Sequence, residues 1–222
     1  MKTQIRNLLS LILVLCIITL LYHSSDEIYS IVCSGIYMAV FYVPIFLYSI
    51  QDATVFSFVS VIVLRKKGKI SIAKENLYKI NFIALFYAFI FLVVYQVIGL
   101  KTNDIYNRSE MMFSVFIIQY AGWFFIGTFY YLIFVICKKK AVSFLVSWTI
   151  VCFNIFSSSV LFYPGKNIYN IYKNMFVFQE KNNIVFFIQR NYPIVIFIIL
   201  CISMIMFFSK KMDLIEKRKG IV

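Results

Sequence analysis

Charged residues and glycine are scarce in this chain of 222 residues. Only 14% of its residues are charged, against about 25% in a soluble domain, and it has 7 glycines and 3 prolines. So few charges, together with 62% hydrophobic residues, exclude an intrinsically disordered chain, which has the opposite balance. A mean hydropathy of +0.87 also excludes a water-soluble globular domain. The composition therefore predicts a polytopic membrane protein.

The sequence also lacks the motifs of nucleotide-binding and hydrolytic enzymes. It contains no G-x-x-x-x-G-K-[ST], H-E-x-x-H or G-x-S-x-G pattern, and its single histidine is His23. Its five cysteines form no C-x-x-C pair. We therefore expect no catalytic residues, no cofactor and no metal site.

Six apolar segments approach the roughly 20 residues that a helix needs to cross a bilayer. The shortest, Leu8–Tyr22, is followed by no small-residue cleavage site, so we interpret it as a permanent span rather than a signal peptide. We predict an all-α fold of six transmembrane helices in a single transmembrane domain, residues 1–222. The other five spans are Ile28–Ile50, Ile80–Leu100, Met112–Ile136, Val142–Tyr163 and Tyr192–Phe208.

The basic residues are distributed unevenly between the two sides of this topology. If both termini are cytoplasmic, 16 of the 22 Lys and Arg residues lie in inside segments and 6 lie outside. Cytoplasmic segments of membrane proteins carry such an excess. We therefore predict cytoplasmic N and C termini, with the net charge of +13 facing anionic membrane lipid and not nucleic acid. Heavy use of Ile, Phe, Tyr, Asn and Lys is typical of AT-rich bacterial genomes, so the expected location is a bacterial cell membrane.

The first long connection, residues 51–79, is predicted to lie on the cytoplasmic side. If the preceding span continued through its apolar stretch, the helix would be about 55 Å long, too long for one crossing. We therefore expect a break at Gln51-Asp52, with residues 53–64 at the interface or beneath the bundle. Ser71–Lys79 would form an amphipathic helix parallel to the membrane, which either anchors on lipid or docks on a cytoplasmic partner.

The second long connection, residues 164–191, is predicted to lie outside the cell. It carries an apolar stripe at helical spacing and a further apolar run after a polar turn. This pattern is typical of two short helices that dip back toward the membrane, or of a helix lying on the outer leaflet. The candidate residues of such a re-entrant gate are Ile171, Met175, Phe176, Phe178 and Phe186.

The residues of the first long connection resemble a known family. Gln51-Asp52 precedes an apolar stretch that ends in Val61-Ile62-Val63-Leu64, and the basic run Arg65-Lys66-Lys67-Gly68-Lys69 follows. With six spans, cytoplasmic termini and a re-entrant outer loop, the chain resembles an ABC-2-type transporter permease. The most similar members are the small permeases of Gram-positive peptide and bacteriocin exporters, such as phenol-soluble-modulin exporters and lantibiotic-immunity transporters.

The resemblance implies a permease that is not itself an enzyme and that moves amphipathic or hydrophobic peptides, for export or for self-immunity. A separate cytoplasmic ABC ATPase subunit would sit beneath a homo- or heterodimer of permease subunits and drive them. The substrate path would be lined by the first, second and fifth spans. The candidate residues for coupling to the ATPase are Asp52, Arg65, Gly68, Ile72, Leu77 and Tyr78.

Two other interpretations remain open from the sequence. One is the six-span substrate-binding subunit of a vitamin uptake transporter. Those proteins dock through alanine-rich seams in the first span, and Leu8–Tyr22 contains no alanine. The other is a non-transporting membrane accessory or immunity protein.

Overall fold

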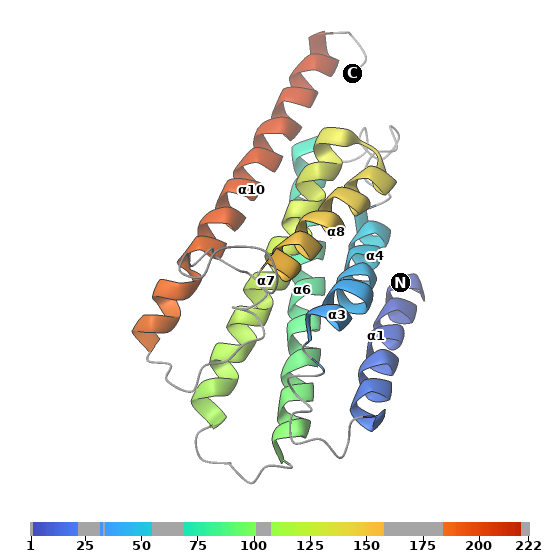
Figure 1. The fold of residues 1–222 in the computed structure, drawn as a ribbon. Coiled ribbons are helices and arrows are strands. Elements are labelled where there is room, and N and C mark those ends of the chain that lie inside the picture. The colour runs from blue at the N-terminus through green and yellow to red at the C-terminus, as the bar shows by residue number, and fades with distance from the viewer. Residues whose placement is uncertain are drawn as a thin grey trace.

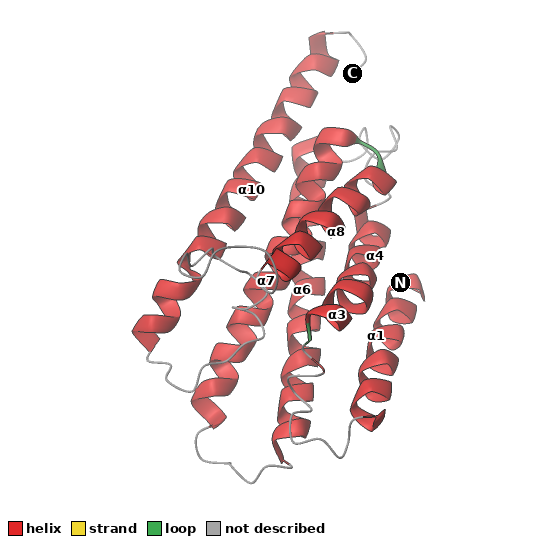
Figure 2. Ribbon diagram, in the orientation of Figure 1, coloured by secondary structure: helices red, strands yellow, loops and turns green. Residues whose placement is uncertain are grey.

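In the computed structural model of the protein, the described residues are 2–21, 32, 34–54, 69–100, 108–157 and 184–218, and every regular element in them is helical (Figure 2). The predicted all-α class is therefore confirmed for these ranges. The elements are α1 (Lys2–Leu21), α3 (Gly35–Tyr37), the π-helix η1 (Met38–Tyr42), α4 (Val43–Thr54), α6 (Lys69–Leu100), α7 (Arg108–Cys137), α8 (Lys140–Ser157) and α10 (Ile184–Arg218).

Four stretches of these helices are long and apolar enough to cross a membrane. They are Gly35–Thr54, Lys69–Val94, Phe116–Cys137 and Tyr192–Lys211. The apolar parts of α1 and α8 among the described residues, Leu9–Thr19 and Lys140–Phe153, are shorter. The structure thus contains four candidate spans within its described ranges, where the sequence predicted six.

The helices form one bundle, with α6 and α7 as antiparallel neighbours at its centre (Figure 1). α10 packs against α7 and α6, α1 packs against α4, and α8 crosses α7, α4 and η1 obliquely. The start of α6, the end of α7, the start of α8 and the C-terminal end of α10 all lie at one end of the bundle, the upper end in Figure 1. We call it the basic end because it carries Lys69, Lys74, Lys79, Lys138, Lys139, Lys140, Lys210 and Lys211.

Aromatic side chains fill the centre of the bundle. Trp123 of α7 is fully buried, and its ring centroid lies 4.8 Å from that of Phe46, 5.4 Å from that of Tyr87 and 5.6 Å from that of Phe91. The ring of Phe46 is tilted against Trp123, that of Tyr87 meets it edge-on and that of Phe91 stacks on it, and such aromatic pairs stabilise a core beyond the area that they bury. This cluster joins α4, α6 and α7.

Gly127 lets the same three helices approach one another closely. A Cβ atom at this position would lie 2.6 Å from Cγ2 of Ile80 and 2.8 Å from Cδ1 of Ile50. Carbon atoms pack at about 3.5–4.0 Å, so no side chain fits here unless a neighbouring side chain or helix moves.

α4 does not end at Gln51-Asp52, as expected from the sequence. It continues to Thr54, and Ala53 and Thr54 are buried in the bundle. The Thr54 hydroxyl donates a hydrogen bond to the Ile50 carbonyl at 2.9 Å, so its polar group is satisfied within the helix. Burial of Ala53 and Thr54 favours continuation of the helix past Asp52. Asp52 therefore lies within the candidate span Gly35–Thr54.

Residues 71–79 do not form a separate helix parallel to the membrane. They are the first turns of α6, which runs without interruption from Lys69 to Leu100 (Figure 1). The reason is tertiary packing, because Ile72 and Ala73 are buried and Nδ2 of Asn76 donates to the Tyr131 hydroxyl of α7 at 3.0 Å. These turns therefore pack on protein.

α10 begins at Ile184, within the segment expected to be an outer loop, and has Pro193 inside it. A proline removes one backbone hydrogen bond, and membrane helices tolerate that loss. The apolar residues before Pro193 therefore continue the helix of the predicted last span.

Candidate functional site

The first turns of α6 at the basic end have one buried face and one exposed face. On the buried face, the Ile72 side chain is only 4% exposed and Asn76 bonds to α7. On the exposed face lie Lys74 and Tyr78, and Tyr78 is 76% exposed. A partner that approaches this end therefore meets Tyr78 but not Ile72, and Leu77 is half-buried between the two faces.

Lys79 and Glu75 extend the charged surface of these turns. The Lys79 ammonium lies 3.0 Å from Oε1 of Glu75, and both side chains are partly exposed. An exposed pair at this spacing contributes about 0.3–0.5 kcal/mol to helix stability. Its larger effect here is on charge, because it neutralises Glu75 and leaves the basic end positive.

Asp52 connects α4 to α1 near the same end. Its Oδ2 accepts a hydrogen bond from Nδ2 of Asn7 at 3.4 Å, and its side chain is half-buried. The hydroxyl of Tyr130 on α7 is buried and has no hydrogen-bond partner in the described structure. Asp52 thus links helices inside the protein. No local pattern in the sequence pointed to Asn7 or Tyr130, because both come from distant segments.

The other predicted residues are not placed by the structure. Phe186 belongs to α10, but its side chain is not among those described. The candidate residues that lie outside the described ranges are Arg65, Gly68, Ile171, Met175, Phe176 and Phe178.

A second site, not expected from the sequence, is the contact between η1 and α8. In η1 the Val43 N–H donates to the Met38 carbonyl, five residues earlier, as in any π-helix. The next carbonyl, of Ala39, would pair in the same pattern with the nitrogen of Pro44, which carries no hydrogen. Instead, Nε1 of Trp148 on α8 donates a hydrogen bond to the Ala39 carbonyl at 2.8 Å.

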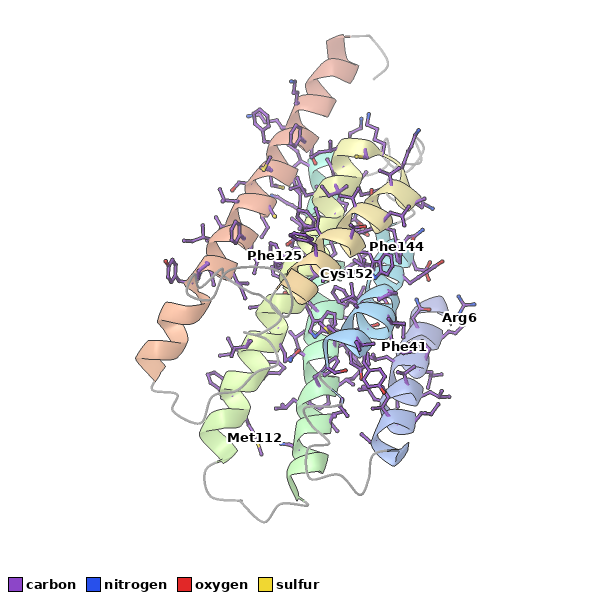
Figure 3. The ribbon with its side chains drawn as sticks, viewed as in Figure 1. Arg6, Phe41, Met112, Phe125, Phe144 and Cys152 are labelled. Carbon is purple, nitrogen blue, oxygen red and sulfur yellow. The ribbon has the colours of Figure 1, made fainter. Side chains whose placement is uncertain are left out.

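Trp148 thus replaces a bond that Pro44 removes. An unpaired backbone carbonyl in a membrane costs several kcal/mol, so a neighbouring helix that supplies a donor stabilises the segment of η1 and α4. A second contact of α8 lies further along α4, where the rings of Tyr48 and Phe144 meet edge-on with centroids 5.4 Å apart. Phe144 and Cys152 mark the position of α8 in Figure 3.

The remaining buried polar groups join helices or turns. The hydroxyls of Ser49 and Tyr87 lie 3.2 Å apart, and Nε1 of Trp123 donates to Oε1 of Gln119 at 3.0 Å. Tyr120 donates to Oδ1 of Asn81 between α7 and α6. In the described ranges, no group of three or more His, Cys, Asp or Glu residues is placed to hold a metal ion. These contacts position helices and assemble no acid, base and nucleophile.

Neither sequence nor structure comparison assigns the chain to a family. No protein-family model, no curated protein and no solved structure matches it. Within its described ranges, the chain is a helical protein with four helices able to cross a membrane and a basic end where α6, α7, α8 and α10 start or finish.

Proposed function

We propose that the protein is the membrane-spanning permease subunit of an ABC exporter in a bacterial cell membrane. In this proposal α1 and α8 complete six spans, and a separate cytoplasmic ATPase drives the movement of amphipathic peptides. A second permease subunit, identical or different, completes the transporter. The observation that carries the proposal is the exposed face of α6 at the basic end, which offers a docking surface to a partner.

The charge distribution supports the orientation. Lysines from α6, from the turn between α7 and α8, and from α10 lie at the same end of the bundle. Cytoplasmic ends of membrane proteins are enriched in such residues. The outer surfaces of the helices are apolar, with Leu9, Phe82 and Ile199 all more than half exposed. A bundle with an apolar girdle and one basic end is what the proposed topology requires.

The packing of α6 supports a mechanism for coupling. Because Ile72 and Asn76 fix the first turns of α6 to the bundle, these turns are a rigid part of the candidate span Lys69–Val94. A partner that pushes on Lys74 and Tyr78 moves the whole of α6. Through the Trp123 cluster, that movement reaches α4 and α7. No flexible connection absorbs the push within residues 69–100.

The test is ATP-dependent uptake of a fluorescent amphipathic peptide by inside-out vesicles from the native host. We expect vesicles with the intact chain to accumulate the peptide only with ATP, and vesicles without the chain to accumulate none. Tyr78→Ala should reduce both uptake and co-purification of the ATPase. Phe113→Ala is the matched control, because Phe113 is 70% exposed but lies on α7 toward the opposite end.

Two results would contradict the proposal. Uptake that continues without ATP would remove the ATPase from the mechanism. Equal uptake by vesicles with and without the chain would show that it is not a transporter subunit.

A further inference from the structure

α8 lies at an angle to the neighbouring helices of the bundle. It packs against α7 and crosses α4 and η1 obliquely (Figure 1), while its outer face, with Val142, Leu145, Ile150 and Phe153, is exposed. We propose that α8 is a movable helix, hinged at the Lys138 turn and latched to η1 by the hydrogen bond from Trp148 to Ala39. The movement opens the seam between α8 and α4, and it does not depend on the proposed transporter class.

In the π register of η1, the Ala39 carbonyl has no backbone partner. The Val43 N–H is bonded to the Met38 carbonyl and Pro44 offers no hydrogen, so in this register the Ala39 carbonyl pairs with Trp148 or with a group that enters when α8 moves. In an ordinary helix the carbonyl would keep its backbone partner, and a neighbouring helix would gain little by bonding to it. Because Pro44 has no N–H, the Ala39 carbonyl of η1 is hydrogen-bonded in this register when α8 holds Trp148 in place.

Two features oppose the latched position. The Ser147 hydroxyl, next to Trp148, is fully buried and has no hydrogen-bond partner in the described structure. A buried hydroxyl without a partner destabilises the state that buries it. Movement of α8 away from the bundle allows water or a polar ligand group to reach it.

The turn at the start of α8 is the second feature. Lys138 has φ of 56°, in the left-handed region that disfavours residues other than glycine and asparagine. Its N–H bonds to the Phe134 carbonyl at 2.8 Å and holds it in this conformation at the end of α7. A strained residue in the two-residue connection is the natural point for α8 to rotate about, because rotation changes its backbone angles.

The contacts and strains at α8 act on the latched position in opposite directions. The Trp148 bond and the Tyr48–Phe144 contact favour the latched position, whereas the buried Ser147 hydroxyl and the strained Lys138 disfavour it. In the open position the Ala39 carbonyl loses the partner that it has in the latched position. That carbonyl gives a peptide N–H or a water molecule a polar contact inside the membrane.

The test measures how fast a maleimide alkylates Cys152 in the full-length protein reconstituted in nanodiscs, with the other four cysteines replaced by alanine. Cys152 lies one turn after Trp148 and is half-buried, so it reports on the seam. We expect Trp148→Phe to accelerate alkylation roughly fivefold, as for the loss of one hydrogen bond. Ser147→Ala should slow it, because the latched position then buries no unpaired hydroxyl.

Pro44→Ala tests the origin of the latch. It supplies an N–H to the Ala39 carbonyl within the helix, so Trp148→Phe should accelerate alkylation much less in that background. If Trp148→Phe accelerates alkylation equally in the Pro44→Ala background and in the parent protein, the proposed reason for the latch is wrong.

A second reporter separates movement of α8 from general unfolding. A chain whose only cysteine is Cys201 reports on α10, where that side chain is buried. Trp148→Phe should leave the alkylation rate of Cys201 unchanged. Trp123→Phe, which removes the same indole donor from the core, should not raise the rate at Cys152 more than the rate at Cys201. An unchanged rate at Cys152, or equal acceleration at both cysteines, in the Trp148→Phe protein would overturn the proposal.

Discussion

The hydrogen bond between Asn76 and Tyr131 helps to hold the first turns of α6 against α7, and its coupling free energy can be measured. Both side chains are 1% exposed, and Nδ2 of Asn76 lies 3.0 Å from the Tyr131 hydroxyl. Tyr131→Phe removes the acceptor and leaves a buried amide unpaired, at a cost of about 1–3 kcal/mol. Asn76→Leu keeps the branched shape and the number of side-chain heavy atoms but leaves the Tyr131 hydroxyl unpaired, with a cost of the same kind.

The double variant distinguishes a bond from independent packing effects. Asn76→Leu with Tyr131→Phe removes both polar groups and leaves neither unpaired, so its loss should be smaller than the sum of the two single losses. Hydrogen bonds between membrane helices average about 0.6 kcal/mol and reach about 1.7 kcal/mol in double-mutant cycles. Because this pair is fully buried, we expect a coupling free energy of roughly 1 kcal/mol, toward the upper part of that range.

The assay is reversible unfolding in mixed micelles with increasing dodecyl sulfate, followed by far-ultraviolet circular dichroism. Tyr78→Phe is the control, because its ring is exposed and its substitution should leave the midpoint unchanged. Strictly additive losses in the double variant would refute the reasoning. They would mean that the first turns of α6 are held by apolar contacts alone.

Two further predictions test packing and orientation. Gly127→Ala should destabilise the protein by about 1–3 kcal/mol in the same unfolding assay, because its Cβ overlaps Ile80 and Ile50 and overpacking costs that much. Ile80→Ala removes the overlapping Cγ2, so it should cost less in the Gly127→Ala background than in the parent protein. A Gly127→Ala protein as stable as the parent would show that the helices separate freely. The orientation is tested in intact cells with a membrane-impermeant maleimide, on proteins whose only cysteine is Phe113→Cys or Lys139→Cys. The reagent should label Phe113→Cys but not Lys139→Cys, because the basic end is expected to face the cytoplasm. Labelling of Lys139→Cys from outside would reverse the topology.

The helical class could be predicted well from the sequence, because a run of about 20 apolar residues has few structural options. Prediction was less successful where two helical segments meet. The spacing of apolar residues in 71–79 correctly indicates a helix, but no local pattern shows whether that helix bends away from the next one. Residues 71–79 continue straight into the rest of α6 because Ile72 and Asn76 pack into the bundle. Between residues 69 and 100 the sequence has no proline and a single glycine, Gly99, so nothing breaks the helix near its start.

Local sequence patterns were also insufficient for α4 and η1. Gln51-Asp52 has the composition of a polar helix end. In the structure the Asp52 carboxylate accepts a hydrogen bond from Asn7 on α1, 45 residues earlier in the chain, and α4 continues to Thr54. The bond from Trp148 to Ala39 spans 109 residues. From the sequence alone, Pro44 signals a free carbonyl at Val40, four residues earlier, and the π register of η1 moves the free carbonyl to Ala39. Which residue pairs with that carbonyl depends on the oblique path of α8, which only the fold provides.

The length of α10 has a consequence for the thickness of the bilayer that the protein suits. Its 35 residues extend about 52 Å, yet the apolar part from Tyr192 to Phe208 covers only about 26 Å. Exposed Lys210 and Lys211 lie at one edge of this part and exposed Tyr192 lies at the other, and such residues anchor a helix at the two interfaces. A hydrocarbon core of about 30 Å exceeds this uncharged part by a few ångströms, whereas the stretch from Tyr192 to Lys211 matches it. When α10 stands upright, the aliphatic stems of Lys210 and Lys211 therefore lie within the edge of the hydrocarbon core and their ammonium groups extend to the interface, which suits the protein to bilayers no thicker than this.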